Sequence, residues 1–189
     1  MKKYIFVLTI AFILGVSSYA VYDKNLKFND EAISLAKDYK TVSELYNDYQ
    51  VIVKGKITED YIERDVQLTE KIAKERVYNV KVNKLLTNNT TININKGDVI
   101  LLSQTYGIEM NGEYYPLSEE LKDSLGNGNY IFFLDTYEDE NTGEVMYSSS
   151  QNAIFKQKGE KYKNVYGGSL PELTELEVEK EIEKEKKIK

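Results

Sequence analysis

Along most of residues 50–166, apolar side chains recur at every second position. In residues 77–86, for example, Tyr78, Val80 and Val82 alternate with polar side chains. A period of two places alternate side chains on opposite faces of an extended strand, whereas a helix needs a period near 3.6. This stretch therefore predicts a mainly β fold in which each strand buries at least one face.

Turn residues divide this stretch into short strands. The expected strands are residues 51–58, 77–86, 91–94, 99–105, 130–134, 144–148, 153–158 and 162–166, and the expected turns are residues 96–98, 141–143 and 158–160. Gly55, inside the first strand, predicts a bulge or a tight bend. Short strands of this kind within about 115 residues suit a small, partly open antiparallel β-barrel better than a two-sheet sandwich. Residues 50–168 are therefore assigned to one barrel domain.

Residues 29–49 have a helical pattern, and residues 21–49 form an expected helical lead-in to the barrel. Asn29 or Asp30 can cap a first segment, and Thr41 or Ser43 can cap a second, because short polar side chains accept hydrogen bonds from free N–H groups at a helix start. A short N-terminal helix is therefore expected before the first strand.

Residues 169–189 form an expected charged C-terminal helix. Ser169 followed by Glu172 is typical of a capping box, and the apolar positions expected to share one face are Leu170, Leu173 and Leu176. After residue 178 the sequence is rich in Glu and Lys without a sustained apolar stripe, so we expect the end of this helix to be solvated or frayed. A helix that docks on a partner is the alternative.

The N-terminus carries the features of a secretory signal. Two lysines precede an almost unbroken apolar run over residues 4–16, and Ser18 and Ala20 supply the small residues of a cleavage site. Residues 1–20 are therefore predicted to be a signal peptide, the mature chain to begin at Val21, and the protein to be secreted or held in the cell envelope. An uncleaved signal is the alternative, and it is the only membrane attachment we expect, since about 13 apolar residues span a bilayer poorly.

Composition excludes several classes of function. Removal of residues 1–20 takes away two lysines, so 23 basic and 31 acidic residues remain and the net charge is −8. Such a charge is unsuited to a nucleic-acid backbone, so we expect no nucleic-acid partner. The chain has no Cys and no His, which excludes disulfides, His-based catalysis and the usual zinc sites. No cofactor is expected.

The order of several short segments resembles that of a known group of proteins. The segments are residues 44–46 (ELY), 51–57 (VIVKGKI), 78–86 (YNVKVNKLL), 96–100 (KGDVI), 116–117 (PL), 128–134 (GNYIFFL) and 153–156 (AIFK). In this order the chain is similar to an uncharacterised group of small exported or lipid-anchored proteins of Gram-positive bacteria. The resemblance implies an OB-like barrel and no particular activity.

The chain departs from that group in two respects. It lacks the Cys through which the anchored members carry a lipid, and residues 60–75 form a longer charged excursion between the first two strands. The group is also loosely similar to the barrel of tissue metalloproteinase inhibitors, which reach zinc through an N-terminal Cys. Because this chain has no Cys, that mechanism is not expected here.

An acidic cluster surrounds the expected turn at residues 141–143. Its members are Asp135, Glu138, Asp139, Glu140 and Glu144. Carboxylate oxygens could hold Ca²⁺, but Gly143 occupies the third ligand position counted from Asp139, so the spacing fails that of a calcium-binding loop. We expect a solvated turn and no metal site.

Paired carboxylates could also hydrolyse a glycosidic bond, a reaction that needs neither His nor Cys. The candidates lie in the expected long loop before the central strand and are Glu109, Glu113, Glu119 and Glu120. No feature of the sequence marks them as buried, as a catalytic acid requires. No catalytic residue is therefore assigned, and a hydrolase acting on cell-wall glycan remains the alternative function.

The same loop contains the best binding candidates, which are Tyr106, Met110, Tyr114 and Tyr115. OB barrels bind ligands on one strand face and in the flanking loops, often by stacking on aromatic rings. The alternative is that these rings close one end of the barrel and complete its core. The sequence thus favours an exported, non-enzymatic binding protein, with a protein, peptide or glycan as its unidentified ligand.

Overall fold

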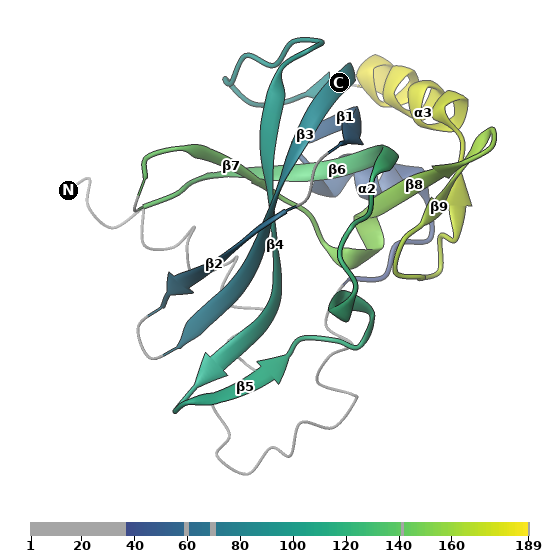
Figure 1. Ribbon diagram of the computed structural model, residues 1–189. Helices are drawn as coiled ribbons and strands as arrows, with labels where there is room; N and C mark the ends of the chain where they lie inside the picture. Colours follow the sequence, from purple (N-terminus) through teal and green to yellow (C-terminus); the bar gives the residue numbers. More distant parts are fainter. Residues whose placement is uncertain (1–36, 59–60, 69–70, 141, 189) are drawn as a thin grey trace. The chain divides into compact units, whose positions relative to one another are not determined.

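The computed structural model describes residues 37–58, 61–68, 71–140 and 142–188 (Figure 1). Of the described residues, 49% lie in strands and 18% in helices, which confirms a mainly β fold. The expected signal peptide and most of the expected helical segment before residue 41 lie outside the described residues. In the described part of the chain, no helix has the length and apolarity needed to cross a membrane.

The elements described below all belong to one compact unit, Asp38–Lys189. Its strands are β1 (Val51–Ile57), β2 (Ile62–Gln67), β3 (Ile72–Asn88), β4 (Val99–Met110), β5 (Glu113–Pro116), β6 (Gly128–Glu138), β7 (Val145–Ser148), β8 (Ile154–Lys158), β9 (Lys161–Asn164) and β10 (Glu172–Leu173). Its helices are α2 (Val42–Asp48) and α3 (Glu175–Ile188), with short 3₁₀ turns η2 (Glu120–Lys122) and η3 (Gln151–Ala153).

Among the described residues, five strands pair in a closed ring in the order β1-β3-β4-β7-β6 and back to β1. All of these pairings are antiparallel except that of β4 with β7, which is parallel. Gly55 lies where the β1–β3 register shifts, so the predicted bulge is confirmed. A Cβ at Gly55 would lie 2.5 Å from Val80 Cγ1, which explains why this crowded position needs a glycine.

The inner face of the ring holds the first hydrophobic core. Tyr78, Val80 and Val82 lie there and are at most 1% exposed, as the alternation in β3 predicts. They pack with residues of the other ring strands and of β8, among them Val53, Ile57, Leu102, Tyr130, Phe132 and Ile154.

A second core lies on the opposite face of β1 and β6. Ile52, Ile131 and Phe133 pack there with apolar side chains of α2, α3, β8 and β9, including Leu45, Phe155, Tyr162, Val178 and Ile182. The two helices thus cover one outer side of the sheet. This explains why β1 and β6 are apolar on both faces, since each strand lies between two cores.

Helix α2 begins where the sequence predicts. The Thr41 side chain accepts a hydrogen bond from the Glu44 N–H, and the Glu44 carboxylate accepts one from the Thr41 N–H, so Thr41 rather than Ser43 is the cap. Leu45 and Tyr46 are then the buried residues of the helix.

Helix α3 begins later than predicted. Glu172, expected within the helix, lies in β10 and pairs with Lys163 of β9. The capping box is instead formed by Thr174 and Glu177, since the Thr174 Oγ1 accepts from the Glu177 N–H at 3.2 Å and the Glu177 carboxylate accepts from the Thr174 N–H at 2.6 Å. The prediction of a helix start at Ser169 is therefore wrong, because strand pairing with β9 takes precedence over a local capping pattern.

The face of α3 also differs from the expected one. Leu176, expected on the packing face, is 57% exposed, whereas Val178 and Ile182 are 0% and 4% exposed in the second core. The segment after residue 178 is thus part of an ordered helix with a buried side chain. Lys54 of β1 and Lys84 of β3 further fix α3 through ion pairs with Glu175, at 2.7 and 2.9 Å.

Two predictions about the strands are wrong. Residues 91–94 form bends and irregular backbone instead of a strand. The expected charged excursion at residues 60–75 contains β2, which pairs along the first part of β3. β2 carries charged side chains on both faces, so it lacks the alternation of apolar and polar residues by which a strand is predicted.

β3 and β4 extend beyond the ring and carry β2 and β5 on their outer edges. We call this four-stranded sheet the arm, consisting of β2 with the preceding Tyr61, β5, and residues 72–77 and 104–110. Figure 1 shows the arm at the end of β3 and β4 that lies away from α3. The arm carries the four residues predicted to bind a ligand.

Candidate functional site

The predicted binding loop is a β-hairpin within the arm. Its segments β4 and β5 meet at a turn in which Asn111 and Gly112 have positive φ angles of 54° and 78°. Glu109 is paired with Tyr114, and Ile108 with Tyr115. Because successive residues of a strand point to opposite faces, Tyr114 and Tyr115 lie on opposite sides of the sheet.

The four predicted binding residues are therefore divided between the two faces of the arm. The rings of Tyr106 and Tyr114 are in contact, with centroids 6.4 Å apart. Met110 is paired with Glu113 at the tip of the hairpin. Glu113 lies two residues before Tyr115, and the Tyr115 hydroxyl donates to the Glu113 carboxylate at 2.5 Å. A single platform made of all four side chains does not exist, and only Tyr106 and Tyr114 are brought together.

Tyr114 lies directly over Gly107. A Cβ at Gly107 would approach a ring carbon of Tyr114 to 2.3 Å, so the absence of a side chain there allows the ring to lie against the backbone. The other side of the ring faces solvent, and Tyr114 is 50% exposed. The sheet thus holds an exposed aromatic ring in a defined orientation.

Tyr106 continues into a stack around Arg76. The Arg76 guanidinium carbon lies 4.2 Å from the centroid of the Tyr106 ring and 5.0 Å from that of Tyr61. With Tyr114, these residues form a row on one face of the arm, which we call the aromatic row: Tyr61, Arg76, Tyr106 and Tyr114. Burial, and secondly the charge of Glu63, raise the pKa of Tyr106 above that of a free phenol.

Arg76 joins the aromatic row to the segment before β6. Its Nη1 and Nη2 donate to the backbone carbonyls of Leu121 and Lys122, at 2.8 and 3.1 Å, and its Nε lies 3.4 Å from Glu63 Oε1. Arg76 is only 7% exposed. Arg76 was not predicted from the sequence as a site residue, since its partners are distant in sequence and no local pattern indicates them.

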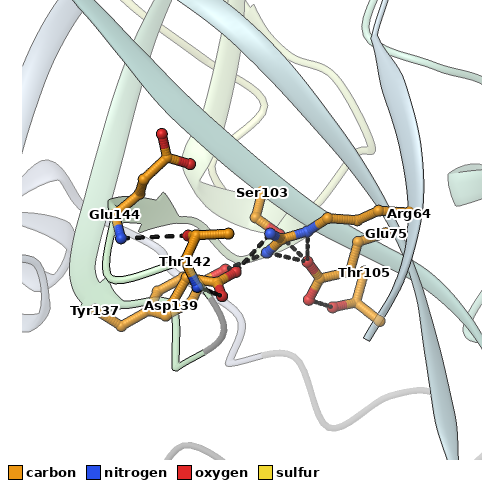
Figure 2. A network of polar contacts seen from close by, with 8 residues as sticks. All are labelled: Arg64, Glu75, Ser103, Thr105, Tyr137, Asp139, Thr142 and Glu144. Carbon is orange, nitrogen blue, oxygen red and sulfur yellow. Dashed lines mark hydrogen bonds and ion pairs between the residues drawn. The ribbon is translucent and has the colours of Figure 1, made fainter. Parts of the chain in front are cut away.

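The other face of the arm carries a network around Arg64 (Figure 2). Arg64 donates to Glu75 Oε2 from Nε at 3.0 Å and from Nη2 at 2.9 Å, and Nη1 donates to Asp139 Oδ2 at 2.5 Å. Ser103 Oγ also donates to Glu75 Oε2, at 2.7 Å. Burial lowers the pKa of Arg64, but the hydrogen bonds to Glu75 and Asp139 outweigh it and raise the pKa overall.

This network connects the β2–β3 hairpin to the turn after β6. Glu75 and Asp139 are 8% and 5% exposed, so water solvates their carboxylates poorly and the charge of Arg64 stabilises them instead. The prediction of a solvated acidic turn is therefore wrong for Asp139. No sequence pattern predicts the ion pair of Arg64 with Asp139, because the two residues are 75 positions apart.

Asp135, on β6, is another exception to the expected solvated turn. Burial raises its pKa from 3.8 to about 6, whereas a hydrogen bond from the Gln50 backbone opposes the shift. A carboxyl group with a raised pKa stabilises the fold below its unfolded pKa, and this contribution is lost as the pH rises through about 6.

We therefore expect Asp135→Asn to be more stable than the wild type at pH 8, by about 1 kcal/mol after allowance for partial exposure. The difference should decline as the pH falls from 6 to 4, and urea unfolding at several pH values measures it. Glu160→Gln, a change at an exposed turn, serves as the control. Equal stabilities of Asp135→Asn and wild type at pH 8 would contradict the expected effect of burial.

The carboxylates considered for hydrolysis do not gather at one place in the described structure. Glu109 forms an ion pair with Lys74 at 2.9 Å, and Glu119 forms one with Lys122. Glu113 accepts the Tyr115 hydroxyl, and Glu120 is exposed. Within the described residues, no group of three or more Asp or Glu side chains is placed to hold a metal ion.

Comparisons with protein families, with curated proteins and with solved structures find no match to this chain. The geometry of the arm is therefore the basis for a functional proposal.

Proposed function

We propose that this chain is an exported, non-enzymatic binding protein that recognises a protein partner of the cell envelope through the aromatic row. The single observation that carries the proposal is Tyr114, a half-exposed ring held over Gly107 in contact with Tyr106. Tyrosine rings are enriched at the centres of protein interfaces, because they bury a large area at a small cost in side-chain entropy.

The attachment of the arm to the rest of the fold supports this role. Arg76 on one face and Arg64 on the other join the arm to segments outside it, through the Leu121 carbonyl and the Asp139 carboxylate respectively. A binding surface that is ordered before its partner arrives loses less entropy on association. The aromatic row therefore has the properties of a preorganised surface.

We infer further that the five-strand ring is an OB-like barrel. An OB fold is a five-stranded, partly open barrel that binds ligands on its second and third strands and in neighbouring loops. The second and third strands of this ring are β3 and β4, and both continue into the arm. The apolar run at residues 4–16 supports export and so a partner outside the cytoplasm.

Tyr114→Ala tests this function, and Tyr115→Ala is its matched control on the opposite face of the hairpin. The purified full chain and both variants are immobilised and exposed to envelope extract, and the retained protein is identified and its affinity measured. We expect Tyr114→Ala to weaken binding about tenfold or more, as at an interface hot spot, and Tyr115→Ala to change it by less than about twofold.

Thermal unfolding of both variants should stay close to that of the wild type, since Tyr114 is half exposed. Equal retention by Tyr114→Ala and wild type would remove the aromatic row as the binding surface. A retained glycan in place of a protein would overturn the proposed class of partner.

A further inference from the structure

β2 is an edge strand of the arm, because it has a neighbouring strand on one side only. Among the described residues β2 pairs with β3 alone, whereas β3 lies between β2 and β4. The Leu68 and Lys71 backbones exchange two hydrogen bonds and close the β2–β3 hairpin. From there the register runs without a shift from Gln67 to Ile62. The β2–β3 ladder thus lacks the bulge that in many proteins bends an edge strand away from further pairing.

The register also determines which backbone groups of β2 face outward. In an antiparallel ladder, residue pairs that exchange two hydrogen bonds alternate with pairs that exchange none. Counted from the Leu68–Lys71 pair, residues 62, 64 and 66 bond to β3, and the N–H and C=O groups of Glu63, Asp65 and Gln67 point away from it. Within the described ranges, no other backbone group bonds to these three residues. β2 therefore offers a row of free donors and acceptors to a further strand.

The exposed side chains of this edge differ between its two faces. Glu63 and Asp65 lie on the face of the aromatic row, and their side chains are 51% and 59% exposed. The cations that pair with them, Arg76 and Lys74, are only 8% and 19% exposed. The accessible charge on this face of the edge is therefore negative. On the opposite face Ile62 is 67% exposed, so an apolar side chain lies uncovered there.

We propose that β2 binds an extended segment of a partner protein as an antiparallel fifth strand of the arm, and that basic and apolar residues alternate in this segment. Directly opposed residues of two antiparallel strands lie on the same face of a sheet. Lysine or arginine therefore lies opposite Glu63 and Asp65, and an apolar residue lies opposite Ile62. Backbone hydrogen bonds supply affinity in this mode of binding, and the alternate side chains supply specificity.

The charges of β2 favour such a partner over a second copy of this chain. Two copies of β2 can pair across a two-fold axis with their outward groups engaged in two central registers. One register places Asp65 opposite its own equivalent, and the other places Glu63 opposite Asp65. Like charges directly opposite each other destabilise strand pairing, whereas opposite charges stabilise it. A basic segment therefore fits the edge better than β2 itself does.

This edge is separate from the ring that carries the proposed function. β2 and β5 are the two outer strands of the arm (Figure 1). Three strand spacings, roughly 14 Å, lie between β2 and Tyr114. The inference goes beyond the proposed function and does not depend on Tyr114, so the two can fail independently.

The experiment uses the ¹⁵N-labelled full chain and the peptide acetyl-Thr-Lys-Val-Lys-Val-Lys-Thr-amide. We expect this lysine peptide, at about 1 mM or less, to shift the amide resonances of Glu63, Asp65 and Gln67. It should also slow the exchange of these three amides with solvent, because each becomes hydrogen-bonded. A peptide with Glu in place of each Lys should bind about fivefold or more weakly, because its charges repel the edge.

N-methylated peptides test the strand pairing without any change to the protein. In the proposed register the lysine N–H groups face β2 and the valine N–H groups face away from it. Methyl groups on two lysine nitrogens should weaken binding about tenfold or more, because two hydrogen bonds are lost. Methyl groups on the two valine nitrogens serve as the matched control and should weaken it less than about threefold.

Asp65→Asn tests the charge of the edge from the side of the protein. It should weaken binding of the lysine peptide about threefold or more. Glu160→Gln, which removes one charge at an exposed turn outside the arm, is its control and should leave binding nearly unchanged. Resonances remote from β2 show whether each variant is folded.

Four results would overturn the proposal. The first is an absence of shifts and of slowed exchange at Glu63, Asp65 and Gln67. The second is equal binding of the lysine and glutamate peptides, and the third is an equal effect of the two methylation patterns. The fourth is an equal effect of Asp65→Asn and Glu160→Gln, because the attraction would then come from overall charge and not from the edge.

Discussion

Replacement of Phe133 by alanine will lower the free energy of unfolding by about 3–5 kcal/mol. Phe133 is fully buried on β6, where its ring contacts those of Tyr49 and Phe155, at centroid distances of 6.3 and 6.0 Å. The change removes a ring from the second core and leaves a cavity among rigidly paired strands, which collapse poorly around it. Urea unfolding measures the difference, provided that the slope of the transition is unchanged.

Phe133→Leu keeps most of the volume and should cost less than about 1.5 kcal/mol, so the prediction stays testable if the alanine variant does not fold. Leu176→Ala is the control on α3, where the side chain is 57% exposed, and we expect a change below about 0.5 kcal/mol. If Phe133→Ala costs no more than Leu176→Ala, the second core between the helices and β6 does not exist as described.

Glu75→Gln is expected to lower the free energy of unfolding by about 2–3 kcal/mol. Gln has nearly the shape of Glu, but its amide is neutral and offers N–H donors to a position where Arg64 and Ser103 already donate. The guanidinium then loses the charge that neutralises it on one side and keeps only Asp139. Chemical unfolding at pH 7 provides the measurement.

Asp65→Asn on the same hairpin is the matched control. Asp65 forms an ion pair with Lys74 at 2.8 Å, but its side chain is 59% exposed, and exposed pairs contribute about 0–1 kcal/mol. The buried pair should thus be clearly the more costly one to break. Equal effects of Glu75→Gln and Asp65→Asn would show that the Arg64 network does not depend on exclusion of water.

The inner core was largely predictable from alternation. In β3, Tyr78, Val80 and Val82 are buried as their spacing predicts, because a strand has only two faces and one of them is apolar. Gly55 and Thr41 were predictable for a similar reason, since a bulge and a helix cap depend on backbone geometry within a few residues.

The strand pairing that forms the arm could not be predicted from the sequence. The strand β2 carries Glu63, Arg64 and Asp65 in succession, a run that is typical of a solvated loop. All three side chains form ion pairs in the fold, but only Arg64 binds a fully buried carboxylate, that of Asp139, whereas Glu63 and Asp65 pair with Arg76 and Lys74 on the opposite face of the sheet. Charge alone cannot indicate which side chains of such a run will be buried.

The candidate site was predicted only in part for the same reason. Tyr106 and Tyr114 do lie together, but Arg76, which supports them, was not foreseen, and Tyr115 lies on the other face of the hairpin. A turn at Asn111 and Gly112, shorter than the loop expected there, decides which tyrosines share a face.

By itself, the sequence determined the mainly β character, the inner face of the ring and the cap of α2, because each depends on a periodicity or a hydrogen bond within a few residues. The tertiary structure alone decided the start of α3, the burial of Asp139, and the partners of Arg64 and Arg76. These features depend on which strands become neighbours when the ring closes. That choice joins residues far apart in the sequence, 75 positions in the Arg64–Asp139 pair, and no local pattern predicts it.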